Sequence, residues 1–516
     1  MYHQFQQGNS EDSWNYSCDE LWRSPSINNI VHSATIPDEQ TPLLSQIIIP
    51  STDRVTRWTE SFWKRGFILN ILPVLIVLIW CSIPIPFDDC ATLPCDYDPY
   101  SLSPAISILP LAEKPNNQPT LINFWFFLFW YYGVYNAIAL FLITKMFSIY
   151  AVNWWPKPLG AKVTFMLFWL TTQAVAVVGY YFTNLDKYTL SWVFLTFLNM
   201  WLPVLGALIN IHLHNMKRSQ RKLYPAFGDP KTISIFISPS EHTHIHIPAS
   251  YRRFLWFCVA LFIALFALVS GEIYAYVFLS TLPHTSLDAV VYVYSWVGAI
   301  YVMDAITDYI IHRRVRSYPL ATVFKLYFFM IYFIFYRNLF ARLRSVDQFA
   351  LVQLGSFLWV CIYYPLVITR HTHSLCVRMF GTTLTYEEYR DKIGRSFYLR
   401  NLAENTTMLG FLCWVNILHF GPNRAAYPYF HFDEQVSEDS PYTHRTTFIA
   451  ALVIWTSELT SAYITRWTFK RYFKHSVTQQ AIREFTQYPE MIIGFVLVMV
   501  HVLQNILLAL IKLDFA

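Results

Sequence analysis

Three side chains that can carry charge or a proton lie at a spacing of four residues within one apolar stretch. The stretch runs from Val291 to Arg316 and contains Asp304, Asp308 and His312. Residues four apart lie on the same face of a helix, so these three form one stripe. Carboxyl groups inside a membrane span are costly to bury and usually face a protein interior or a water-filled path. The stripe is therefore predicted to belong to a path for a substrate or an ion.

Lys325, in the next apolar stretch, is predicted to neutralise this stripe. Counted from the short turn between the two stretches, Lys325 lies at a depth between Asp304 and Asp308, roughly 10–15 Å along the helices. Two acids and one lysine leave one negative charge over, which favours a protonatable or cation-binding site. The alternatives are a structural ion pair between two packed helices and snorkelling of the lysine to the interface. Two further acids inside apolar stretches, Glu272 and Glu458, complete the predicted pathway residues.

The composition that surrounds these residues is typical of α-helical membrane proteins. Of the 516 residues, 55% are hydrophobic and 14% are charged, and apolar runs of about 20 residues recur along the chain. We predict an all-α, polytopic integral membrane protein with about eleven transmembrane helices, within a range of nine to twelve. The mild net charge of +5 gives no reason to expect nucleic-acid binding. The predicted spans are 66–86, 121–147, 163–182, 190–212, 254–279, 291–316, 319–336, 349–369, 402–420, 446–465 and 491–512.

The N-terminal segment, residues 1–53, is polar and is predicted to be a disordered cytosolic tail that precedes a multi-span domain, residues 54–516. Within the tail, Glu39 lies four positions before the pair Leu43 and Leu44. This pattern resembles the acidic dileucine signal that clathrin adaptors bind, and the alternative is a chance match of a short motif. A working signal predicts an adaptor partner and an endolysosomal or vacuolar membrane as the location.

The distribution of basic residues predicts which side of the bilayer each loop occupies. With the N-terminus in the cytosol, most of the 38 Lys and Arg residues flank the cytosolic ends of the spans. One loop disagrees, because Arg337, Arg342 and Arg344 fall on the opposite side. That loop is either a surface that faces anions or the sign of a re-entrant pair of helices around residues 337–348.

Two cysteines, Cys90 and Cys95, lie together in the Pro-rich loop after the first predicted span. In an oxidising lumen they can close a small disulfide ring, and the alternative is two free thiols. The sequence contains no P-loop, no dinucleotide fingerprint and no Cys/His zinc spacing. No cofactor and no metal site is therefore predicted.

The acids inside the spans favour one function over its alternatives. The leading hypothesis is a transporter or channel for a small solute or ion. The second is a membrane-embedded enzyme that acts on a lipid, for which Asn416 and His419, three residues apart, could supply acid/base chemistry. The third is a scaffold or sorting protein without transport activity.

Overall fold

The structure, a computed structural model, is almost entirely helical in the residues that it describes. These are residues 50–88, 121–149, 161–183, 189–223, 249–280, 286–340, 353–381, 384–430, 432 and 443–513. The other secondary structure described is a short antiparallel pair, β1 (Phe87–Asp88) and β2 (Leu121–Ile122). The predictions for the N-terminal tail with Glu39, Leu43 and Leu44, and for the Cys90–Cys95 disulfide, lie outside the described residues.

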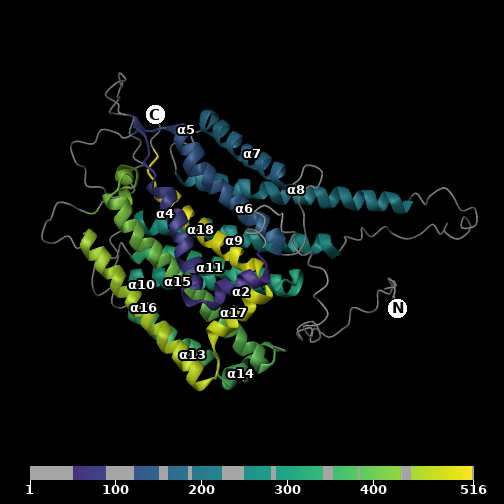
Figure 1. Ribbon diagram of the computed structural model, residues 1–516, viewed down its shortest axis with the longest axis vertical. Helices are drawn as coiled ribbons and strands as arrows, with labels where there is room; N and C mark the ends of the chain where they lie inside the picture. Colours follow the sequence, from purple (N-terminus) through teal and green to yellow (C-terminus); the bar gives the residue numbers. More distant parts are fainter. Residues whose placement is uncertain are drawn as a thin grey trace, which may run out of the picture.

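The first part of the chain forms helices that surround the bundle. Two π-helical turns occur among them: η2 lies between α3 and α4, and η4 lies between α5 and α6. The elements are α2 (Thr52–Glu60), α3 (Phe62–Gly66), η2 (Phe67–Ile71), α4 (Leu72–Ser82), α5 (Phe124–Phe126), η4 (Phe127–Tyr132), α6 (Gly133–Ile149), α7 (Ala161–Phe182), α8 (Thr189–Leu223) and α9 (Ala249–Ser280). Figure 1 shows α7 and α8 at one margin of the molecule and α6 closer to its middle.

The second part of the chain supplies the central helices and those that carry most of the ionisable side chains. The π-helical turns here are η7 and η8, and η9 and η10 are short 3-10 helices. The elements are α10 (Ser286–Ile310), η7 (Ile311–Val315), α11 (Tyr318–Phe340), η8 (Trp359–Tyr363), α13 (Tyr364–Val367), α14 (Arg370–Phe380), α15 (Tyr386–Phe420), η9 (Pro422–Ala426), η10 (Pro428–Phe430), α16 (His444–Tyr472), α17 (Val477–Gln487) and α18 (Glu490–Leu510).

Eight of the described helices are long and apolar enough to cross a membrane. They are Phe62–Ser82, Phe124–Phe147, Lys162–Phe182, Leu190–Asn210, Arg252–Ala275, Tyr318–Arg337, His444–Tyr472 and Glu490–Leu510. The all-helical membrane class is thus supported, whereas the count of about eleven is not confirmed. Three predicted spans are not among the eight. Residues 291–316 lie in α10 and η7, residues 402–420 lie in α15, and Gln353–Val367 is a shorter apolar helix.

Two helices, α11 and α18, form the centre of the bundle. In α18 the apolar window is 94% buried and in α11 it is 83% buried, against 22% for α7 at the margin. A helix with apolar residues around most of its circumference can be enclosed by other helices, and both sequences have this property. α18 packs against α4, α6, α8 and α11, while α11 packs against α9, α10 and α15 as well. Figure 1 shows both helices enclosed by the others.

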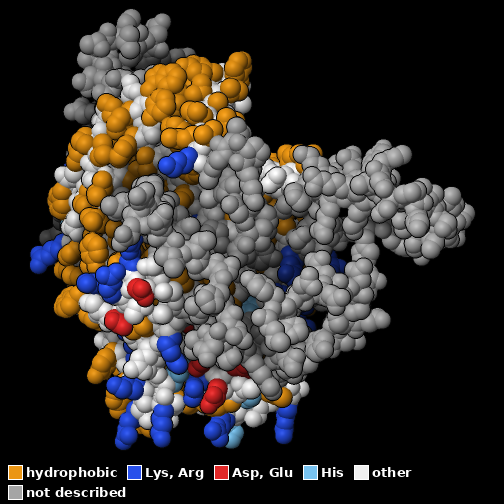
Figure 2. Space-filling model, turned by 45° about the vertical axis from the view of Figure 1, so that its right-hand side comes forward, with side chains coloured by type: hydrophobic (Ala, Val, Ile, Leu, Met, Phe, Trp, Pro, Cys, Tyr) orange, Lys and Arg blue, Asp and Glu red, His pale blue; other side chains and the backbone are white. Residues whose placement is uncertain are grey.

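The segment between residues 370 and 401, in which no span was predicted, is helical for most of its length. Thr385 and Glu388 form a capping box, in which Glu388 Oε2 accepts from the Thr385 backbone N–H at 2.9 Å. From this cap α15 continues without a break to Phe420. Figure 2 shows Lys and Arg side chains gathered at the lower end of the molecule, where Figure 1 places α14 and α17.

Candidate functional site

The outer end of the candidate site is an ion pair between α10 and α15. Lys392 Nζ lies 2.9 Å from Asp308 Oδ2, and His312 Nδ1 lies 3.1 Å from Asp308 Oδ1. Lys392 is 42% exposed, so this end is open at the surface of the described structure. The predicted stripe therefore brings Asp308 and His312 together. The predicted surplus of one negative charge is wrong, because Lys392, which lies between the predicted spans, neutralises Asp308.

The next pair lies one helical turn further in. Lys325 Nζ of α11 is 2.9 Å from Asp304 Oδ2 of α10, and both side chains are largely buried. The structure thus shows the partner that the matching depth predicts for Lys325. Asp308 is close enough to interact electrostatically with both members of this pair. The two ion pairs are therefore neighbours, one helical turn apart on α10.

Tyrosines connect these pairs to a third group of charges. Tyr301 of α10 lies within electrostatic range of both Lys325 and Arg400 of α15. Tyr363, in η8, interacts with the same two cations. The Arg400 guanidinium also lies over the ring of Tyr364, 6.0 Å from its centroid. Tyr301 and Tyr363 thus lie within electrostatic range of both Lys325 and Arg400.

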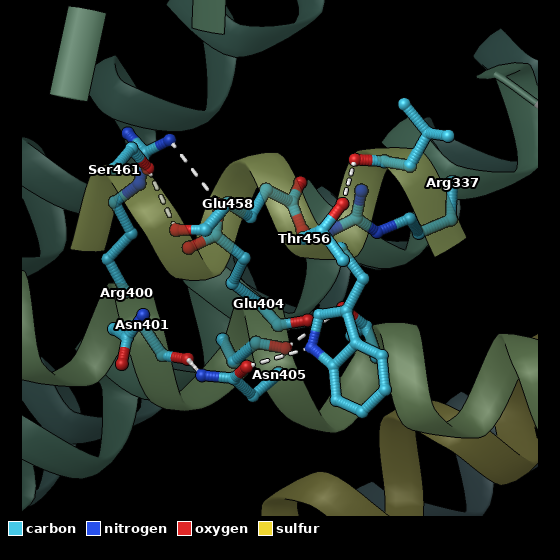
Figure 3. A network of polar contacts seen from close by, with 12 residues as sticks. Arg337, Arg400, Asn401, Glu404, Asn405, Thr456, Glu458 and Ser461 are labelled. Atoms are coloured by element: carbon cyan, nitrogen blue, oxygen red, sulfur yellow. Dashed lines mark hydrogen bonds and ion pairs between the residues drawn. The ribbon is translucent and has the colours of Figure 1, made fainter. Parts of the chain in front are cut away.

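The innermost part of the site contains two arginines and two glutamates. Arg337 of α11 forms an ion pair with Glu458 of α16, and Arg400 Nη2 lies 3.9 Å from Glu404 Oε1 on α15. Both guanidinium groups lie over the Phe333 ring, at 5.7 Å and 5.4 Å from its centroid. Figure 3 shows the glutamates between α15 and α16. All four charged side chains are at least 95% buried.

This innermost group is incompletely satisfied within the described structure. Nε and Nη1 of Arg337, Nε of Arg400, Oε1 of Glu404 and Oε1 of Glu458 are buried and make no hydrogen bond to a described residue. Buried polar atoms without partners are costly, so native structures usually pair them or give them water. The group therefore offers both donors and acceptors to an additional polar species.

We name the whole arrangement the ionic track. Its charged members form ion pairs that follow one another from the surface to the interior. On α15, Arg400 and Glu404 lie one turn apart on one face and Lys392 lies about two turns before Arg400, so the distance from Lys392 to Glu404 is about 18 Å along the axis. The track consists of Asp308, His312, Lys392, Asp304, Lys325, Arg400, Glu404, Arg337 and Glu458.

The position of Arg337 corrects a prediction about the loop that follows α11. Sequence analysis placed Arg337 in a basic loop on the far side of the bilayer, which was either a surface that faces anions or the sign of a re-entrant pair of helices. In the structure Arg337 belongs to α11, is 2% exposed and pairs with Glu458. The other two arginines of that loop, Arg342 and Arg344, lie outside the described residues.

Glu272, the remaining predicted pathway residue, does not belong to the ionic track. It lies on α9, next to Tyr327 of α11. Tyr327 and Lys325 are two residues apart on α11 and so point to opposite sides of that helix. Glu272 therefore belongs to a second buried cluster, which also contains His501 of α18. Sequence analysis had not singled out His501, because a lone histidine in an apolar run gives no local signal.

Asn416 and His419, considered for acid/base chemistry, are used in local structure. Asn416 Nδ2 donates to the carbonyl of Leu412 at 2.7 Å, within α15. His419 Nδ1 lies 2.9 Å from the carbonyl oxygen of Phe430, and its ring stacks on His444 at 4.7 Å. These contacts tie the end of α15 to η10 and to the start of α16.

The fold and the ionic track define an all-helical membrane protein with charged side chains buried among its helices. Within this class the chain belongs to the family described as SPCC553.12c, whose family model matches residues 51–511. It is similar to the Uncharacterized protein C553.12c of Schizosaccharomyces pombe. The two are 35% identical over 484 residues, which cover 93% of this chain and 86% of the relative. No solved structure matches the chain.

Proposed function

We propose that this protein is a multi-pass membrane transporter or channel for a small solute or ion. The observation that carries the proposal is the ionic track, in which charged side chains of α10, α11, α15 and α16 follow one another from a half-exposed lysine to buried glutamates. Burying charge among membrane helices is costly, and such residues commonly mark ion or substrate pathways. The unsatisfied atoms at its inner end supply positions that a passing polar species would occupy.

A purely structural role explains less of this arrangement. Replacing a buried ion pair by apolar residues of similar volume is often neutral or stabilising, so packing alone does not require four arginine and lysine side chains here. A structural network would also be expected to satisfy its own hydrogen bonds. The ionic track contains equal numbers of acidic side chains and of lysine and arginine side chains. Its successive ion pairs suit stepwise movement of a charged or strongly polar species, because each pair can compensate the charge of that species.

The test is a flux assay on the full chain reconstituted into vesicles, after a screen of protons, monovalent and divalent cations, phosphate and amino acids. The variant combines Asp304→Asn with Lys325→Met, which removes one ion pair without changing the net charge. We expect this double variant to keep its fold and lose flux. Full activity of the double variant would contradict the proposal.

A matched control is available outside the ionic track. Arg395 Nε lies 3.0 Å from Glu484 Oε1, and the two side chains are 17% and 14% exposed, close to the 17% and 12% of Lys325 and Asp304. Arg395→Met combined with Glu484→Gln therefore removes an ion pair of similar burial and length. We expect this control to retain flux.

We further propose that the protein resides in an endolysosomal or vacuolar membrane with its N-terminus in the cytosol. The support is the tail motif formed by Glu39, Leu43 and Leu44, together with the excess of basic residues on one side of the predicted spans. Alanine at both leucines should move the protein to the cell surface. The neighbouring control, alanine at Ser45 and Gln46, should leave it in place. An unchanged location of the dileucine variant would exclude adaptor-dependent sorting.

A further inference from the structure

The second buried cluster is centred on a carboxyl group without a counter-charge. Glu272 of α9 is 5% exposed, and both of its carboxyl oxygens are buried without a hydrogen-bond partner among the described residues. Its polar neighbours come from three other helices. They are Tyr135 of α6, Tyr327 of α11 and Asn505 of α18. This environment differs from that of Glu404 and Glu458, which each face an arginine.

His501 of α18 is enclosed by the same two tyrosines. Its side chain is completely buried, and its ring stacks on Tyr135 at 5.4 Å with an interplanar angle of 4°. On the other side the Tyr327 ring lies at 6.3 Å and 15°. Neither ring nitrogen of His501 has a hydrogen-bond partner in the described structure. The cluster therefore contains two titratable groups that no other charge compensates.

The hydrogen bonds around Asn505 show what the cluster lacks. Asn505 Nδ2 donates to the Tyr135 hydroxyl at 2.7 Å. Asn505 Oδ1 is buried and accepts no hydrogen bond from a described residue. Glu272 lies beside this amide and, as a carboxylate, could only accept. The Asn505 amide N–H favours the carboxylate, whereas a proton on Glu272 would turn one of its acceptors into a donor and so give Asn505 Oδ1 a partner.

The charges around Glu272 also favour a protonated carboxyl group. Among the described residues, the titratable groups within electrostatic range of Glu272 are the phenols of Tyr135 and Tyr327, with His501 stacked on both, and no basic side chain acts on Glu272. A bare carboxylate in such surroundings costs far more than the neutral acid. Lys325, the cation nearest in sequence to Tyr327, points away on the opposite side of α11 and pairs with Asp304.

We propose that Glu272 is a proton-binding site at the centre of the bundle, in which Asn505 accepts the bound proton's hydrogen bond and His501 is a second acceptor nearby. This inference deepens the proposed function, on which it rests for its role, because it identifies the proton as the transported or coupled ion. Binding is simple protonation of a carboxylate oxygen, and release returns the proton to water or to a neighbouring acceptor.

The site itself is tested without transport, by infrared difference spectroscopy of the full chain in lipid nanodiscs. Near neutral pH we expect a protonated-carboxyl C=O band that is lost in Glu272→Gln. The control Glu387→Gln, at an exposed position on α15, should leave the band unchanged. If the spectrum of Glu272→Gln differs from that of the wild-type protein only by the loss of carboxylate bands, the proposal is overturned. Loss of the C=O band on addition of sodium at constant pH would also overturn it, since this would identify a metal-cation site.

A second variant keeps the test decisive where Glu272→Gln fails to fold. Asn505→Leu removes the proposed acceptor, so the C=O band should shift to the higher frequency of a carboxyl group without a hydrogen bond. An unshifted band would overturn the assignment of Asn505. Proton flux into vesicles, followed with a pH-sensitive dye, separates the two proposals. Presence of the Glu272 band without proton flux upholds the binding site and refutes its role in transport.

Discussion

The ion pair between Arg337 and Glu458 gives the sharpest test of how the inner end of the ionic track is held together. Replacing Arg337 by Met, an apolar residue with an unbranched side chain, removes the cation. Glu458 and Glu404 are then left with Arg400 alone. Arg400 Nη2 is already 3.9 Å from Glu404, so it cannot compensate both acids at close range. The variant therefore leaves an uncompensated carboxylate in a region where all the charged side chains are at least 95% buried.

The expected loss of stability follows from this burial. Breaking a buried ion pair from one side typically costs about 3–5 kcal/mol, which corresponds to about two to four orders of magnitude in the unfolding equilibrium constant. Removing both partners costs much less, because no charge is left behind. We therefore expect Arg337→Met to be strongly destabilising and the double variant with Glu458→Gln to recover most of the loss.

The assay is unfolding of the full chain by a denaturing detergent in mixed micelles, followed by tryptophan fluorescence. Lys392→Met is the control, because Lys392 is 42% exposed in its ion pair with Asp308, and exposed pairs contribute about 0–1 kcal/mol. Two results would refute the reasoning. One is a loss for Arg337→Met no larger than that for the control. The other is a double variant with Glu458→Gln no more stable than the single variant.

Three further predictions concern stability away from the ionic track. Gly394→Ala should cost about 1–3 kcal/mol in unfolding measurements, because a Cβ there would lie 2.3 Å from His475 Nε2, whereas Gly298→Ala, with nothing within 4 Å, should not destabilise. Burial lowers the pKa of His475, so its folded state prefers the neutral ring. Stability should accordingly fall as the pH drops below the ordinary value of about 6.5, and less so in His475→Gln. Asn423→Ala should lower the midpoint of thermal unfolding, since Asn423 Oδ1 accepts from the Ile85 N–H and Nδ2 donates to acceptors on Cys81, Ile83 and Tyr131, and each hydrogen bond contributes about 0.5–1.5 kcal/mol.

Sequence analysis identified the parts of the site that local spacing encodes. The four-residue repeat placed Asp304, Asp308 and His312 on one face, and the short turn between two spans set the depth of Lys325. Both inferences depend on helices adjacent in the chain. Lys392 was not identified, because no helix was predicted between residues 370 and 401, although the capping box at Thr385 is visible in the sequence.

The contacts that sequence analysis could not supply join helices far apart in the chain. Arg337 meets Glu458 across more than a hundred residues, and Tyr135 meets Asn505 across most of the described domain. No local pattern specifies such pairs, because any of several spans could carry the partner. The predicted number of spans differs from the eight long apolar helices for a related reason. Where charges are compensated by other helices, as in α10 and α15, hydropathy along one segment does not decide whether it crosses the membrane.

The enclosure of α18 has a consequence for biogenesis. The ribosome makes α18 after all the other described helices, yet α18 occupies the centre of the bundle with 94% of its apolar window buried. Before it inserts, Tyr135 lacks Asn505, and Glu272 and Tyr327 border an incomplete interior. The earlier helices must therefore remain separable in the bilayer until synthesis reaches residue 510. A chain stopped before residue 490 would present unfinished polar surfaces to the membrane quality-control machinery.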